Sequence, residues 1–159
     1  MYVRPLVEYA SSVWSPSFIN QIISLERIQK KFTKRIPGLQ SLPYLERLSI
    51  LGLQTLESRR LINDLVLCFK IVHGMSSILF SDFFSFSKIK ATRGHQFRLT
   101  PPLLKSNLHK SSYTYRVVAP WNSLPESIVS AGSVQQFKKL VSKSDLTKFL
   151  VYPCNITTP

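Results

Sequence analysis

Residues 22–36 read IISLERIQKKFTKRI, and this stretch has the pattern of an amphipathic helix. Its apolar residues recur at steps of three and four, which places them on one face of an α-helix. Those residues are Ile22, Leu25, Ile28, Phe32 and Ile36. Pro37-Gly38 follows and ends the pattern, because a proline lacks a backbone N–H and commonly breaks a helix, and the glycine after it favours a stop. We therefore expect a helix over residues 22–36 whose apolar face is buried.

Further helices are expected along the rest of the chain. The pattern continues over residues 44–51, which stop at Gly52, and over residues 56–72, which end at His73-Gly74. The apolar stripe of the 56–72 helix is formed by Leu61, Leu65, Cys68, Phe69 and Val72. Residues 113–121 are also expected to be helical despite Pro120, and the capping-box pair Ser133 and Gln136 marks a last helix. The sequence thus predicts a mainly α fold, a small helical domain of about four to five helices.

Between these helices lies a segment of different texture. Residues 76–92 are rich in serine and phenylalanine, which predicts a loop attached to the core by Phe80, Phe83, Phe84 and Phe86. Residues 96–100 partly alternate between polar and apolar side chains, which favours a short extended segment. The chain beyond Leu150 is expected to fray.

The chain is strongly basic. Its 159 residues include 21 Lys and Arg against 8 Asp and Glu, a formal net charge of +13. Such an excess favours a polyanion as partner, whether nucleic acid, an anionic membrane or an acidic protein surface. We expect two clusters of phosphate contacts: Arg27, Lys30, Lys31, Lys34 and Arg35 on the 22–36 helix, and Arg93, His95 and Arg98. The alternatives are a solvated charged face and an ordinary solvated loop histidine.

The sequence offers no local signature of catalysis. The eight acids are scattered, the nearest two being Glu57 and Asp64 at a separation of seven positions, and the five glycines form no phosphate-binding loop. Cysteine and histidine are likewise not clustered at zinc-site spacings. We therefore expect no catalytic residues, no metal and no cofactor. Two cysteines and no span-length apolar stretch lead us to expect an intracellular protein, nuclear or cytoplasmic, without a membrane partner.

Nine short strings carry a family resemblance through their order and spacing. They are VRPLVEYA at 3–10, VWSP at 13–16, LERIQKKFTKRI at 25–36, YLERL at 44–48, LGL at 51–53, LESRR at 56–60, TRGH at 92–95, RVV at 116–118 and WNSLP at 121–125. Together they resemble the C-terminal part of reverse transcriptases from non-LTR (LINE, jockey-like) retrotransposons. The resemblance runs from about residue 2 to about residue 145.

The resemblance implies the region that follows the palm of an RNA-directed DNA polymerase. It implies a thumb-like helical region over 1–75, a connecting segment over 76–111, a C-terminal helical region over 112–150 and a frayed tail over 151–159. The palm of that family holds its metals on a Tyr/Phe-Ala-Asp-Asp turn, and this sequence has no Asp-Asp pair. We therefore expect a non-catalytic fragment of a transposable element, truncated or partial, that binds RNA or DNA backbone nonspecifically.

Other functions stay open at this stage. The missing upstream polymerase domains are a further expected partner of a thumb-like region. The first rival is an active polymerase that acts through acids the sequence does not reveal. The second rival is a protein-interaction or structural remnant without independent activity, in which the phenylalanines of residues 76–92 are exposed where a palm once packed.

Overall fold

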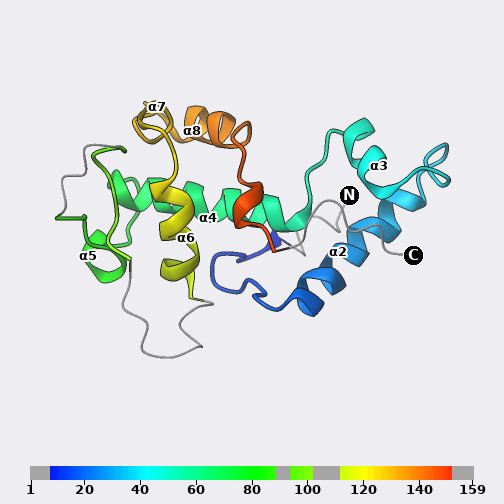
Figure 1. Cartoon of the computed structure of the whole chain (residues 1–159), viewed down its shortest axis with the longest axis horizontal. Coiled ribbons are helices and arrows are strands. Elements are labelled where there is room, and N and C mark those ends of the chain that lie inside the picture. The colour runs from blue at the N-terminus through cyan, green and yellow to red at the C-terminus, as the bar shows by residue number, and fades with distance from the viewer. Residues whose placement is uncertain (1–7, 89–93, 102–111, 152–159) are drawn as a thin grey trace. The chain divides into compact units, whose positions relative to one another are not determined.

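The computed structural model describes residues 8–88, 94–101 and 112–151, and these are mainly helical (Figure 1). The elements are α2 (Ile19–Lys34), α3 (Tyr44–Ile50), α4 (Leu56–Val72), α5 (Phe80–Phe83), α6 (Tyr113–Asn122), α7 (Glu126–Val129), α8 (Val134–Val141) and the 3-10 turn η2 (Thr147–Phe149). Within the described ranges, extended pairing is limited to one antiparallel bridge between Phe86 and Leu99. The predicted mainly α fold is confirmed.

The chain divides into two compact units. Unit 1 comprises the described residues within Met1–Arg60 and Leu146–Pro159, and unit 2 comprises those within Leu61–Asp145. The boundary falls inside α4, so this helix contributes its first turn to unit 1 and the remainder to unit 2. The region boundaries expected after residues 75, 111 and 150 stay predictions.

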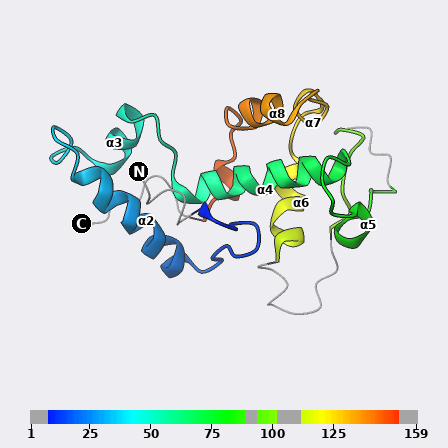
Figure 2. The same ribbon diagram turned by 180° about the vertical axis from the view of Figure 1, so that it is seen from behind.

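Unit 1 is built on α2 and α3, which lie side by side in both views (Figures 1 and 2). The first of these helices ends at Lys34, two residues earlier than predicted, and the chain turns at Gly38. That glycine has a φ of 82°, a left-handed conformation that side chains with a Cβ rarely adopt. The turn returns the chain so that α3 packs against α2.

Unit 2 has an apolar core between α4, α6 and α8. Leu65, Cys68 and Phe69 of α4 are fully buried, as the predicted stripe required, whereas Leu61 and Val72 are only half-buried. The ring of Phe69 stacks on Phe137 of α8 at a centroid distance of 4.4 Å. In both views α6 crosses α4, and α7 and α8 lie along one side of α4 (Figures 1 and 2).

The end of α6 holds the extended segment of residues 95–99. The Asn122 amide pairs with the main chain of Leu99, accepting from its N–H at 2.9 Å and donating to its carbonyl at 2.8 Å. The buried Trp121 indole donates to the carbonyl of Phe97 at 2.8 Å. On the other side, Leu99 forms the bridge with Phe86. Side chains of α6 thus take the place of a second neighbouring strand.

Three local features refine the predictions. The Ser133 hydroxyl accepts from the Gln136 N–H at 3.2 Å as expected of a cap, but the Gln136 side chain accepts from Gly132 instead of closing a capping box. Of the four loop phenylalanines, Phe84 is buried, Phe80 is half-buried, and Phe83 and Phe86 are exposed. Most of the tail predicted to fray, residues 152–159, lies outside the described residues.

We expect the α4 stripe to dominate the stability of unit 2. Leu65→Ala should lower the free energy of unfolding by about 2–5 kcal/mol, because it empties a fully enclosed position. Leu79→Ala is the matched control, since that leucine is 65% exposed, and it should change the free energy by about 0.5 kcal/mol or less. Urea unfolding measures both, and equal losses would contradict the proposed core.

Candidate nucleic-acid interface

The inner face of α2 is polar, which corrects the predicted apolar face. Only Ile22 of the predicted stripe is buried; Ile28 is 40% exposed, and Leu25, Phe32 and Ile36 are half-buried. The other buried side chains of α2 are Glu26, Gln29 and Thr33. Burying polar groups is unfavourable unless they find hydrogen-bond partners. These three side chains are buried because each has such partners in α3, α4 or the chain between them.

The carboxylate of Glu26 links α2 to both of the following helices. One oxygen accepts from the Tyr44 hydroxyl of α3, and the other accepts from the Leu56 N–H at 3.0 Å. That N–H belongs to the first turn of α4, where a negative charge is favourable, and Thr55 caps the same turn through the Ser58 N–H. Burial raises the pKa of the Glu26 carboxyl, while the bonds from Tyr44 and Leu56 act in the opposite direction.

Gln29 extends this network one turn further along α2. Its amide nitrogen lies 3.1 Å from the Tyr44 hydroxyl oxygen and 3.0 Å from the Gln54 carbonyl oxygen, and donates to both. Its amide oxygen accepts from Arg59 at 3.3 Å, and Arg59 also forms an ion pair with Glu8. The glutamine therefore satisfies donors and acceptors from three parts of unit 1.

Thr33 meets a buried arginine of α3. The Arg47 Nε donates to the Thr33 hydroxyl at 3.2 Å, and its terminal nitrogens donate to the carbonyls of Leu42 and Lys30. A cation next to carbonyls near the C-terminal end of α2 is favourable, because those carbonyls carry partial negative charge. Arg47 is thus a structural cation, held between α3 and the C-terminal part of α2.

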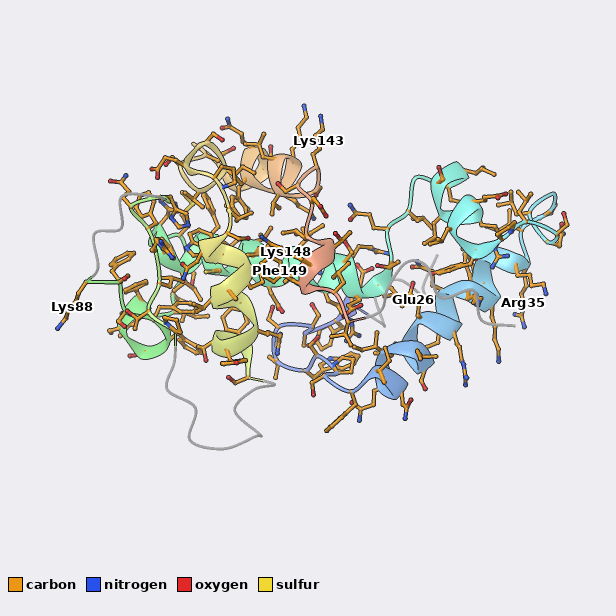
Figure 3. The ribbon with its side chains drawn as sticks, in the orientation of Figure 1. Glu26, Arg35, Lys88, Lys143, Lys148 and Phe149 are labelled. Atoms are coloured by element: carbon orange, nitrogen blue, oxygen red, sulfur yellow. The ribbon has the colours of Figure 1, made fainter. Side chains whose placement is uncertain are left out.

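The outer face of α2 carries the predicted cations. Arg27, Lys31 and Lys34 recur at i, i+4 and i+7 and form one row, with Arg35 beside it. All four are exposed, and none of them has an ion pair with a described residue. Lys30 lies on the flank, half-buried, with its Nζ 6.0 Å from the centroid of the Tyr44 ring. Figure 3 shows the Arg35 side chain extending away from the end of α2. We call Arg27, Lys31, Lys34 and Arg35 the outer basic face.

The second predicted cluster is different in kind. Arg93 lies outside the described residues. His95 is only 3% exposed, and its Nε2 is 3.1 Å from the Trp121 carbonyl oxygen. Because a carbonyl only accepts, Nε2 carries the proton, and burial lowers the pKa of this imidazole. Arg98 is half-buried and packs near Gly94. This burial favours a structural role for His95, and we leave it out of the proposed interface.

A further basic group was missed by the sequence reasoning. Lys138, Lys139 and Lys143 are exposed on α8 and the turn after it, and none has an ion pair with a described residue. Figure 3 labels Lys143 at that turn. The apolar periodicity of this helix could have predicted their exposure. Phe137 and Val141 define the buried face of α8, and the lysines lie off that face. Cations near a helix C-terminus are favourable in themselves, so these lysines need no ligand to explain them.

Other kinds of site receive little support from the described residues. No three His, Cys, Asp or Glu side chains in the ranges 8–88, 94–101 and 112–151 are grouped so that they would hold a metal ion. A hollow in unit 1, lined by residues that include Ser15, Glu26 and Arg60, has a volume of about 20 Å³. That is room for about one water molecule, not for a substrate. No helix of the described chain has the length and apolarity needed to cross a bilayer.

Comparison with known proteins identifies no relative. No protein-family model matches the chain, and no curated protein or solved structure gives a significant match.

We expect Glu26 to make the stability of unit 1 depend on pH. Because burial raises the pKa of this carboxyl, the folded state holds the proton more tightly than the unfolded state does. Its contribution is therefore greatest below the ordinary value of 4.5 and is lost as pH rises through the folded pKa. Glu26→Gln cannot ionise and keeps one side-chain oxygen that accepts from the Leu56 N–H, so it should flatten that decline.

The effect is measured as the urea midpoint for unfolding of unit 1, determined for the wild type and for Glu26→Gln at a series of pH values from 4 to 8. Glu46→Gln, on the exposed side of α3, is the control for losing one carboxylate. The explanation is wrong if the wild-type and Glu26→Gln midpoints change with pH in parallel.

Proposed function

We propose that this chain is a non-catalytic C-terminal part of a retrotransposon RNA-directed DNA polymerase, and that it binds RNA or DNA backbone nonspecifically. The observation that carries the binding proposal is the outer basic face of α2. Four exposed cations lie close together there without an ion pair among the described residues. Like charges held this close repel one another, and a row of phosphates would relieve that repulsion.

The geometry of the face suits a backbone contact better than base readout. Lys34 follows Arg27 by seven residues, which corresponds to about 10 Å along the helix axis. Arginine and lysine on a helix surface neutralise phosphates, and such contacts carry no sequence information. The buried polar network on the opposite side of α2 fixes which side chains point outward. These points support nonspecific binding by a rigid helix.

The retrotransposon part of the proposal rests on the strings of sequence. Two of these strings meet in unit 2, where the Nε2–H of His95, in TRGH, donates to the carbonyl of Trp121, in WNSLP. Strings separated by 26 residues thus form one structural feature.

A second candidate function, a protein-interaction remnant, is favoured by a different observation. Several large apolar side chains between residues 75 and 86 are exposed: Met75, Leu79, Phe83 and Phe86. Exposed apolar groups that lie close together often mark an interaction surface. Concentration-dependent self-association without nucleic-acid binding would favour this candidate over the first.

Charge removal from α2 should weaken nucleic-acid binding more than the same removal elsewhere. The triple variant Arg27→Gln, Lys31→Gln, Lys34→Gln should reduce the slope of log affinity against log salt by about 2–3, at roughly 0.7–0.9 per phosphate contact. The matched control, Lys138→Gln, Lys139→Gln, Lys143→Gln, removes the same charge from α8 and the turn after it and should change the slope much less. Titration of labelled oligonucleotide at several salt concentrations measures both.

Two results would contradict this proposal. Absence of binding at low salt would remove nucleic acid as a partner. Equal effects of the two triple variants would show that net charge, and not the outer basic face, determines the affinity.

Primer extension tests the non-catalytic part of the proposal. We expect no nucleotide incorporation by the chain with Mg²⁺ or Mn²⁺, because polymerases hold two metal ions with grouped carboxylates. Incorporation that survives repurification and is abolished by substitution of a single acid would overturn it.

A further inference from the structure

The segment that leads into α2 exposes three large aromatic side chains. Tyr9, Trp14 and Phe18 are 78%, 41% and 70% exposed, and all three precede α2 within ten residues in unit 1. Single exposed apolar residues are ordinary on protein surfaces. Three exposed aromatic rings on one short segment expose more apolar surface than a single residue does, and such surface often marks an interaction site.

Trp14 is held in a defined position. Its indole N–H donates to the Tyr9 carbonyl at 2.8 Å, which closes the turn through Ala10, a residue with a left-handed φ of 50°. The guanidinium of Arg60 lies 4.1 Å from the centroid of the Trp14 ring. The ring is therefore preorganised against a cation, while part of its surface is open to solvent.

These rings precede the outer basic face in the chain. Phe18 comes nine residues before Arg27, which corresponds to about 13 Å along the axis of α2 and about half a turn around it, so a strand that contacts both must pass around the N-terminal end of the helix. A cationic surface that follows the backbone, combined with aromatic rings for the bases, is the combination that binds single strands. Bases in a duplex are already stacked on one another, so exposed rings add little affinity for duplex.

We propose that residues 8–18 form a base-stacking platform, and that the chain prefers single-stranded nucleic acid to duplex. The platform consists of Tyr9, Trp14 and Phe18, and the outer basic face contacts the phosphates of the same strand. This inference rests on the proposed function, since it specifies the class of nucleic acid that the same region binds.

An anionic membrane surface is the competing partner for basic and aromatic side chains. A helix that lies in a membrane interface needs a continuous apolar face to insert. In α2 the face opposite the cations is packed and polar, with Glu26, Gln29 and Thr33 inside unit 1. The observations therefore favour a nucleic acid.

Tryptophan fluorescence tests the platform directly. The chain has two tryptophans, and Trp121 is fully buried, so a change on adding oligonucleotide reports Trp14. Single-stranded RNA and DNA of about 15 nucleotides, and the matching duplexes, are titrated at low salt. We expect quenching by the single strands and tighter binding of them than of duplex.

Substitution separates stacking from charge. Trp14→Leu with Phe18→Leu should lower single-strand affinity at least about fivefold and leave duplex affinity unchanged, because it removes rings but no cations. Phe83→Leu is the control, since that exposed ring lies in unit 2. Unchanged duplex affinity also shows that the double variant retains the basic face in its folded form.

The outcomes distinguish the two proposals. Salt-dependent binding of single strands and duplex with equal affinity and no quenching overturns the platform and leaves the proposed function standing. Absence of binding to every oligonucleotide overturns both. A fluorescence change with vesicles of phosphatidylserine and phosphatidylcholine, without one on adding oligonucleotide, overturns the platform in favour of a membrane surface.

Discussion

The buried carboxylate of Glu26 is the interaction on which unit 1 depends. It binds the Tyr44 hydroxyl of α3 and the first N–H of α4, so one side chain ties three helices together. A charged group taken out of water is tolerated only when its partners are in place, which makes the arrangement specific. Because Glu26 must face inward, the rotation of α2 about its axis is set. The outward direction of Arg27, Lys31 and Lys34 is a consequence of that rotation.

In unit 2, side chains provide the hydrogen-bond partners of a short extended segment, residues 95–99. A short extended segment needs partners for its main-chain groups, and the described residues provide only one bridge of the strand type. Asn122 and Trp121 at the end of α6 supply three further bonds, and the Glu126 carboxylate of α7 accepts from the Gln96 N–H. The segment is held by side chains that also pack the core, so its position depends on the packing of α6.

Hydrophobic periodicity predicted the helices well and the buried face of α2 poorly. It placed α4 at residues 56–72, the bounds observed, because a fully apolar stripe and a glycine stop agree there. For α2 the same rule chose Ile28 and Phe32 as buried, yet Glu26 and Thr33 are inside because Tyr44, Leu56 and Arg47 meet them. Those partners are distant in sequence, so periodicity cannot detect them. α7 is too short to produce a pattern, and the buried position of His95 depends on the distant Trp121 carbonyl.

The thiol of Cys68 has a consequence for measuring the dynamics of the protein. It is fully enclosed in unit 2, and burial raises its pKa well above the ordinary value, so the reactive thiolate is suppressed in the closed structure. A cysteine-alkylating reagent reaches it only when the packing around α4 separates. When reclosing is fast, the alkylation rate of Cys68 reports the equilibrium population of that separated state, as amide hydrogen exchange does for backbone groups.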